Sequence, residues 1–225
     1  MRIAGVTIHA PEPGQMLEFY SGLLDLEPAG DAGVACGTGR LAFVPGDPPG
    51  YYHLAFGVPH DQFLDAKRWL GDRVPLLTED DRDVFDFRFW NAAACYAFDA
   101  AGNVIELIAH RDLPACGEPF LGAASLTGIA EVGVPASDVL ALTEQLEHEA
   151  GLTTWDGDPP SPRFTAVGAR GATLILVPLG RNWYPTNVPN GPCPLEVTIE
   201  ADRDALLDQP QGLPYIIRCR PATVA

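Results

Sequence analysis

The sequence has 225 residues, a formal net charge of −16 and 47% hydrophobic residues. A chain of this length has enough apolar material for one large domain or two small ones. The negative charge argues against nucleic acid and anionic membranes as partners, because both would be repelled.

The start of the chain, its apolar segments and its cysteines indicate the cellular compartment. Met1 leads directly into a strand-like run, without the basic stretch and apolar region of a signal peptide, and no apolar segment approaches membrane-spanning length. The five cysteines are scattered, odd in number and without a CxxC pair, which is typical of a reduced protein with incidental thiols. We therefore expect a cytoplasmic protein that binds neither nucleic acid nor membrane.

The first half of the chain contains two copies of one pattern, in which a strand leads to a helix and then to a β-rich piece. These three parts are residues 3–8, 15–24 and 33–44 in the first copy, and residues 53–58, 61–70 and 85–108 in the second. Phe63, Ala66 and Leu70 recur at helical spacing, which predicts a helix lying on a sheet.

The second half repeats the pattern twice more. The third copy comprises residues 129–134, 139–147 and 164–177, and the fourth comprises a strand at 195–199, a brief helix and a last strand at 215–219. Such self-similarity marks a repeated supersecondary unit. The stretch 112–124 is rich in Gly, Pro and Ala and predicts a linker.

The repeat predicts an α+β fold of tandem paired βαβββ units, each pair a curved mixed sheet with helices on its convex face. We expect a first module at 1–112, a linker at 113–124, and a second module with a truncated last unit at 125–225.

Three short segments resemble the vicinal oxygen chelate superfamily, which includes glyoxalase I, extradiol dioxygenases, and fosfomycin and bleomycin resistance proteins. They are the strand start 52–56, the helix end 17–20 (LEFY), and 99–107 (DAAGNVIEL), which is close to the signature DPDGNxxEL with two alanines where Pro and Asp are usual. The resemblance extends to about residue 191. It implies the fold more strongly than the activity, because the superfamily hosts many chemistries.

Glu106 is a carboxylate in an otherwise apolar strand, 104–108. Since an unpaired buried charge is costly, Glu106 is expected to be paired, bound to a metal or facing a cavity. Strand alternation places His53 on a small, polar face that would line such a cavity. Imidazole and carboxylate suit Zn, Fe, Mn or Ni. The resemblance implies that both residues are metal ligands and that Glu106 is catalytic; the alternative is a buried His–Glu hydrogen bond without metal.

The third ligand that is usual in the superfamily is missing from its expected place, where the sequence has Gly5. His9 is on the same strand face but about 13 Å further along. The starts of the third and fourth units, 128–129 and 194–195, offer no ligand. We therefore expect a divalent metal that is weakly held, or no metal, in a site on the first module. The second module would be structural or form a lid or interface.

An aromatic and polar segment, 87–91, precedes Tyr96. Its side chains suit a planar or carboxylated ligand, so we predict Arg88, Trp90, Asn91 and Tyr96 as substrate-binding residues. Residues 181–185 repeat this composition in the second half. Ordinary strand packing is the alternative explanation of both segments.

Two function classes follow. The first is a metal-dependent lyase, isomerase or dioxygenase of the glyoxalase/dioxygenase type, acting on a small organic substrate with vicinal oxygens. The second is a metal-free protein of the bleomycin-resistance type that sequesters a small molecule. The joint presence of His53 and Glu106 favours the enzyme. Either protein would be a monomer or a homodimer.

Overall fold

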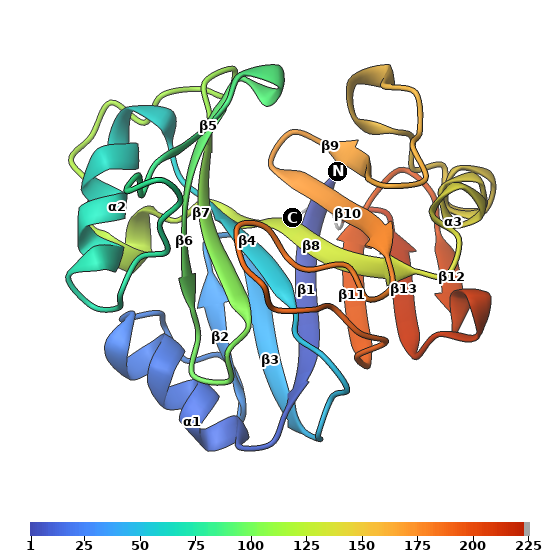
Figure 1. Cartoon of the computed structure of the whole chain (residues 1–225), viewed down its shortest axis with the longest axis horizontal. Coiled ribbons are helices and arrows are strands. Elements are labelled where there is room, and N and C mark those ends of the chain that lie inside the picture. Colours follow the sequence, from blue (N-terminus) through green and yellow to red (C-terminus); the bar gives the residue numbers. More distant parts are fainter. Residues whose placement is uncertain (223–225) are drawn as a thin grey trace.

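The computed structural model describes residues 1–222; residues 223–225, the end of the predicted second module, lie outside this described part. Its strands form one 13-stranded sheet. Figure 1 shows the strands in the centre, α1 and α2 on one side of them and α3 on the other. No helix within residues 1–222 is long and apolar enough to cross a membrane.

The first two units follow the predicted order of strand, helix and further strands. The first unit consists of β1 (Arg2–Ala10), α1 (Pro13–Leu17) with a π-helical continuation (Glu18–Leu23), β2 (Gly33–Cys36) and β3 (Gly39–Pro45). The second consists of β4 (His53–Gly57), a 3-10 turn (His60–Gln62), α2 (Phe63–Gly71), β5 (Phe85–Phe87), a 3-10 turn (Arg88–Trp90), β6 (Ala92–Phe98) and β7 (Val104–His110). Phe63, Ala66 and Leu70 of α2 are buried, as their spacing predicted.

The third unit has the same order of elements as the first, and the fourth is shorter. After a 3-10 turn (Gly122–Ser125), the third unit consists of β8 (Gly128–Ala136), α3 (Val139–Gln145) with a π-helical continuation (Leu146–Ala150), a 3-10 turn (Trp155–Gly157), β9 (Thr165–Ala169) and β10 (Ala172–Pro178). The fourth consists of β11 (Leu195–Glu200), β12 (Ala205–Asp208), a 3-10 turn (Pro210–Gly212) and β13 (Tyr215–Arg220). A strand and a 3-10 turn thus stand where a brief helix was expected.

The first strands of the units pair in an order that differs from the predicted one. β4 of the second unit is antiparallel to β8 of the third, and β1 of the first unit is antiparallel to β11 of the fourth. The predicted modules instead pair the first unit with the second. The difference arises because residues 111–127 return the chain directly to the edge of β4, where Thr127 N donates to Gly57 O at 2.9 Å. The domain boundaries at 113–124 stay a prediction.

A bulge in β8 sets the phase of its side chains. Ala55 of β4 pairs with Glu131, but the next residue, Phe56, pairs with Ile129, so that Ala130 is the extra residue. Ile129 consequently packs in the main core, whereas Ala130 packs in the smaller cluster with Ala55.

The predicted turn between β6 and β7 is held by Asp99. One carboxylate oxygen, Oδ1, accepts from the backbone N–H groups of Ala101 and Asn103, both at 2.9 Å. The other, Oδ2, accepts from the Tyr20 hydroxyl at 3.1 Å. Two of the segments that carry the family resemblance therefore meet in space, and they tie the first unit to the second.

Candidate metal centre

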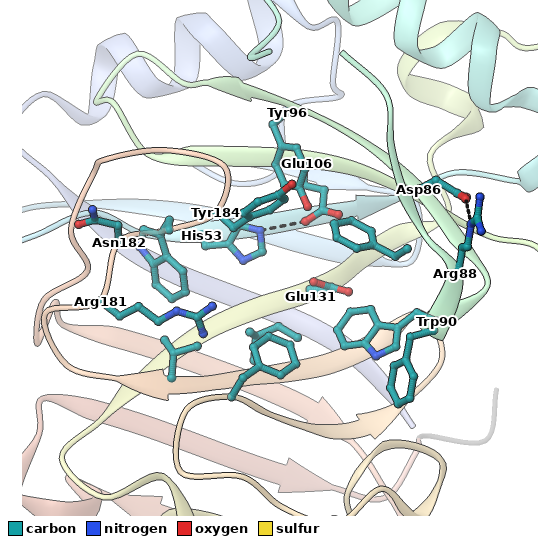
Figure 2. Close-up of a pocket in the computed structure, with 16 residues that line it drawn as sticks. His53, Asp86, Arg88, Trp90, Tyr96, Glu106, Glu131, Arg181, Asn182 and Tyr184 are labelled. Atoms are coloured by element: carbon teal, nitrogen blue, oxygen red, sulfur yellow. Dashed lines mark hydrogen bonds and ion pairs between the residues drawn. The ribbon is translucent and has the colours of Figure 1, made fainter. Parts of the chain in front are cut away.

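Three buried side chains meet on neighbouring strands of the sheet. His53 of β4, Glu106 of β7 and Glu131 of β8 each offer one ligand atom, and these atoms lie within 4.8 Å of one another. His53 Nε2 is 3.0 Å from Glu106 Oε2. All three residues are at most 7% exposed. Figure 2 shows the three side chains converging on one pocket.

Strand register explains the convergence. Ala55 of β4 is paired with Glu106 on one side and with Glu131 on the other. His53 is two residues from Ala55 and therefore on the same face of the strand. The start of the third unit, 128–129, offers no ligand, but Glu131 lies further along β8, where it pairs with Ala55 and adds a carboxylate to the site. Like Glu106, Glu131 is a carboxylate inside a buried apolar run, and this was the signal in the sequence that could have identified it.

Burial shifts the ionisation of all three groups. It raises the pKa of Glu106 well above its ordinary value, and a hydrogen bond from Tyr96 opposes that shift. Burial also raises the pKa of Glu131, and the neighbouring charge of Glu106 raises it further. Burial lowers the pKa of His53. Two adjacent carboxylates cannot both ionise in this environment unless a cation compensates their charge.

The unsatisfied atoms of the site fit a divalent metal. Within residues 1–222, His53 Nδ1 and Glu131 Oε1 are buried and have no hydrogen-bond partner. One imidazole and two carboxylates are a suitable donor set for Zn, Fe, Mn or Ni, and three protein ligands leave coordination positions open for a substrate. A divalent ion would also compensate the two carboxylate charges.

A cavity of about 450 Å³ includes the three residues in its lining. The remaining lining residues are mostly aromatic or apolar, with a few polar groups: Asp86, Phe87, Arg88, Phe89, Trp90, Tyr96, Phe164, Ile175, Val177, Arg181, Asn182, Trp183 and Tyr184. The cavity is therefore suited to a small organic molecule rather than to an ion alone.

The predicted substrate-binding residues are placed differently from one another. Arg88, Trp90 and Tyr96 line the cavity. The Asn91 amide instead donates to Asp112 at 2.7 Å, and among the described residues Asn91 is not part of the lining. Tyr96 is the cross-strand neighbour of Glu106 and forms a hydrogen bond with its carboxylate.

The second half of the chain contributes more than the structural, lid-forming or interface role expected of it. Besides Glu131, it supplies a segment that we call the strap, residues 181–190, of which residues 181–184 line the cavity. Trp183 of the strap stacks obliquely on His53, with ring centroids 5.3 Å apart, and donates from Nε1 to Tyr51 O at 2.7 Å. Gly133 of β8 makes room for this indole, because a Cβ there would come within 2.4 Å of the ring.

No family model and no curated protein matches the sequence. Solved structures match it at low identity. A "putative dioxygenase" from Bacillus subtilis subsp. subtilis str. 168 matches with a TM-score of 0.61 and 15% identity, over 99% of this chain and 86% of its own. Glyoxalase I from Zea mays matches with a TM-score of 0.53 and 13% identity, over 88% of this chain and 74% of its own.

Likenesses at these identities concern the fold, not the activity. The chain has the α+β fold of these two proteins, with few helices and a mixed sheet. The fold that the resemblance implied is therefore confirmed.

Proposed function

We propose that this protein is a metal-dependent enzyme of the glyoxalase/dioxygenase type, acting on a small organic substrate with two neighbouring oxygens. One observation supports the proposal most strongly. His53, Glu106 and Glu131 are buried together beneath a cavity large enough for such a substrate. Without a cation, this arrangement places two carboxylates side by side in an apolar interior, which is unfavourable.

The chain's own residues would divide the chemistry between them. His53 and the two glutamates would hold a divalent ion, which supplies a Lewis acid for the oxygens of the substrate. Glu106 would exchange a proton with the substrate as a carboxylate, because Tyr96 stabilises its charged form through a hydrogen bond. The aromatic side chains above would exclude water from the substrate.

A metal-free protein that sequesters a small molecule is the second candidate. It is favoured by the 3.0 Å contact between His53 and Glu106, which gives Glu106 a hydrogen-bond partner without metal. This contact leaves Glu131 Oε1 unsatisfied, so the enzyme is the better explanation of the whole site.

Metal titration distinguishes the two candidates. Zn²⁺, Mn²⁺, Ni²⁺ and Fe²⁺ (the last without oxygen) are each added to the metal-stripped protein while thermal unfolding is recorded. A metal that binds only the folded state stabilises it by about 2.7 kcal/mol at one hundred times its Kd. For a protein of this size this corresponds to a rise of roughly 5–10 °C in Tm.

The same titration of Glu106→Gln gives the comparison. The variant keeps the shape of the side chain but loses its charge, so we expect most of the metal-dependent rise to disappear. If no metal stabilises the wild type more than this variant, the enzyme proposal fails and the metal-free binder takes its place.

A further inference from the structure

We infer that the ligand of this cavity carries an anionic group, most simply a carboxylate on an aromatic body, and that Arg181 binds this group. The inference rests on the proposed function, since it concerns the substrate of the same site. It depends on the position of Arg181, its free hydrogen-bond donors and the shape of the surrounding walls.

Arg181 is held at the start of the strap. Its backbone N–H donates to Pro178 O at 3.3 Å, and its carbonyl accepts from Asn190 N at 2.9 Å. Figure 2 shows its side chain extending into the pocket that contains the triad. Its Nη1 donates to Arg163 O at 3.0 Å, and its Cζ lies 5.8 Å from the centroid of the Phe164 ring. The guanidinium is thus oriented before any ligand arrives.

This guanidinium still has donors to offer. In the described part of the chain no carboxylate forms an ion pair with Arg181, and one carbonyl accepts from it. A guanidinium has five N–H donors in a planar fork that matches a carboxylate. Arg88, the other arginine of the lining, has a side chain that is 94% exposed and contacts only Asp86, at 3.5 Å, which pairs more closely with Arg111 at 2.8 Å; Arg88 is therefore hydrated rather than directed at a ligand in the cavity.

The walls favour a flat, apolar body for the rest of the ligand. Trp90 of the second unit and Phe164 of the third approach each other with ring centroids 5.7 Å apart. Phe87 and Tyr184 approach in the same way at 6.2 Å. Aromatic rings from both sides of the cavity offer faces and edges on which another ring can pack.

Charge balance points to the same ligand. With a neutral imidazole, the two carboxylates and a divalent ion sum to zero, and Arg181 then leaves the lining positive in this region. The chain as a whole carries −16, so an anionic ligand needs such a local attraction to enter. Since bound metal removes the repulsion from Glu106 and Glu131, the metal and the anionic ligand should each strengthen the binding of the other.

Two probes that differ mainly in charge test the inference. Phenylacetate and its neutral amide, phenylacetamide, are titrated calorimetrically into the Zn²⁺-loaded protein and into the metal-stripped protein. We expect phenylacetate to bind the loaded protein about tenfold more tightly than phenylacetamide, the difference of about 1.4 kcal/mol that a charge-assisted hydrogen bond supplies. Removing Zn²⁺ should weaken the binding of phenylacetate more than the binding of phenylacetamide.

Two arginine variants complete the test. Arg181→Gln should abolish the preference for phenylacetate and leave phenylacetamide binding unchanged. Arg203→Gln removes the same charge from an exposed position outside this cavity and should preserve the preference. The inference would be overturned if the wild type bound both probes with equal affinity. It would also be overturned if Arg181→Gln weakened the binding of both probes equally. The metal-dependent rise in Tm should persist in Arg181→Gln, so a failure here is distinct from a failure of the metal proposal.

Discussion

The sheet contains two sets of strands with the same internal arrangement, and one of them carries the site. In this set, β4 is parallel to β7 of its own unit and antiparallel to β8 of the partner unit. Ala55 lies between Glu106 and Glu131, and His53 is two residues away on the same face. We call β7, β4 and β8 the site set.

The other set, which we call the open set, consists of β3, β1 and β11. β1 is parallel to β3 and antiparallel to β11, and Thr7 lies between Ala42 and Glu196. Gly5 is two residues from Thr7, as His53 is from Ala55. The open set therefore has glycine at the position of the histidine, alanine at that of one glutamate, and a glutamate at that of the other.

The difference shows that strand register determines which positions face one another, whereas the side chains at these positions and their burial determine whether they could bind a metal. Glu196 is exposed, whereas its counterpart Glu131 is 3% exposed. An exposed glutamate is hydrated and needs no cation, but a buried pair of glutamates does. The fold thus offers two equivalent places, and the sequence provides a buried set of candidate metal ligands in one of them.

The largest effect should come from removing the charge of Glu131 in the site set, compared with removing that of Glu196 at the equivalent position of the open set. Glu131→Gln should lose most of the stabilisation by metal, about 2.7 kcal/mol at one hundred times the wild-type Kd. Glu196→Gln is the matched control and should keep it. Thermal unfolding with and without Zn²⁺ measures both. Equal responses of the two variants would mean that metal does not distinguish the two sets.

A second difference between the sets lies two residues further along the partner strand, where the site set has Gly133 and the open set has Thr198. Gly133→Ala should collide with the Trp183 ring and destabilise the protein by about 1–3 kcal/mol, as overpacking usually does. Thr198→Ala removes a half-buried side chain from the open set and should change stability by less than about 1 kcal/mol. Urea unfolding of both variants makes the comparison.

The pH dependence of metal stabilisation should also separate the sets. In the folded, metal-free protein the pKa of Glu106 is raised. Its contribution to stability is therefore fully present below the ordinary carboxyl pKa and is lost as the pH rises through the raised value. Metal displaces this proton, so the gain in unfolding free energy on adding metal should increase with pH, by about 1.4 kcal/mol per unit for each proton displaced.

Unfolding measured between pH 5 and 8, with and without Zn²⁺, tests this dependence. Glu196→Gln should retain the wild-type slope, because Glu196 belongs to the open set. A gain that stays constant with pH would show that metal displaces no proton from the site.

The smallest effect is expected from introducing a histidine and a second glutamate into the open set. Gly5→His combined with Ala42→Glu would place a histidine and two glutamates, with Glu196, in the register of the site. A Cβ at Gly5 would meet no atom closer than 3.8 Å, so the histidine has room at its root. Equilibrium dialysis should then detect a second metal equivalent, bound more weakly because Glu196 is exposed. A stoichiometry that remains at one would mean that burial, and not register alone, creates the site.

Much of the fold could be predicted because the local signals agree with one another. The strand starts, the spacing of apolar residues in α2 and the Asp99 turn all occur where the sequence indicated. The pairing of the second unit with the third could not be predicted in this way. It depends on the path of residues 111–127, which contain no periodic pattern.

The site was predictable only in part, for a similar reason. His53 and Glu106 could be identified because each belongs to a segment that resembles a known family. Glu131 was missed because a ligand was sought only at the start of the third unit, 128–129, whereas Glu131 lies further along β8, beyond the bulge at Ala130. Bulges arise from the pairing of two strands and leave little trace in one strand's sequence.

The bulge in β8 also gives this strand one residue that its pairing does not need. Ala55 and Phe56 are consecutive in β4 and pair with Glu131 and Ile129, so deleting Ala130 would leave both pairs in register and the carboxylate in the cavity. In a regular strand, the loss of one residue turns every side chain beyond it to the opposite face of the sheet. The candidate ligand set should therefore survive a three-base deletion at the codon of Ala130.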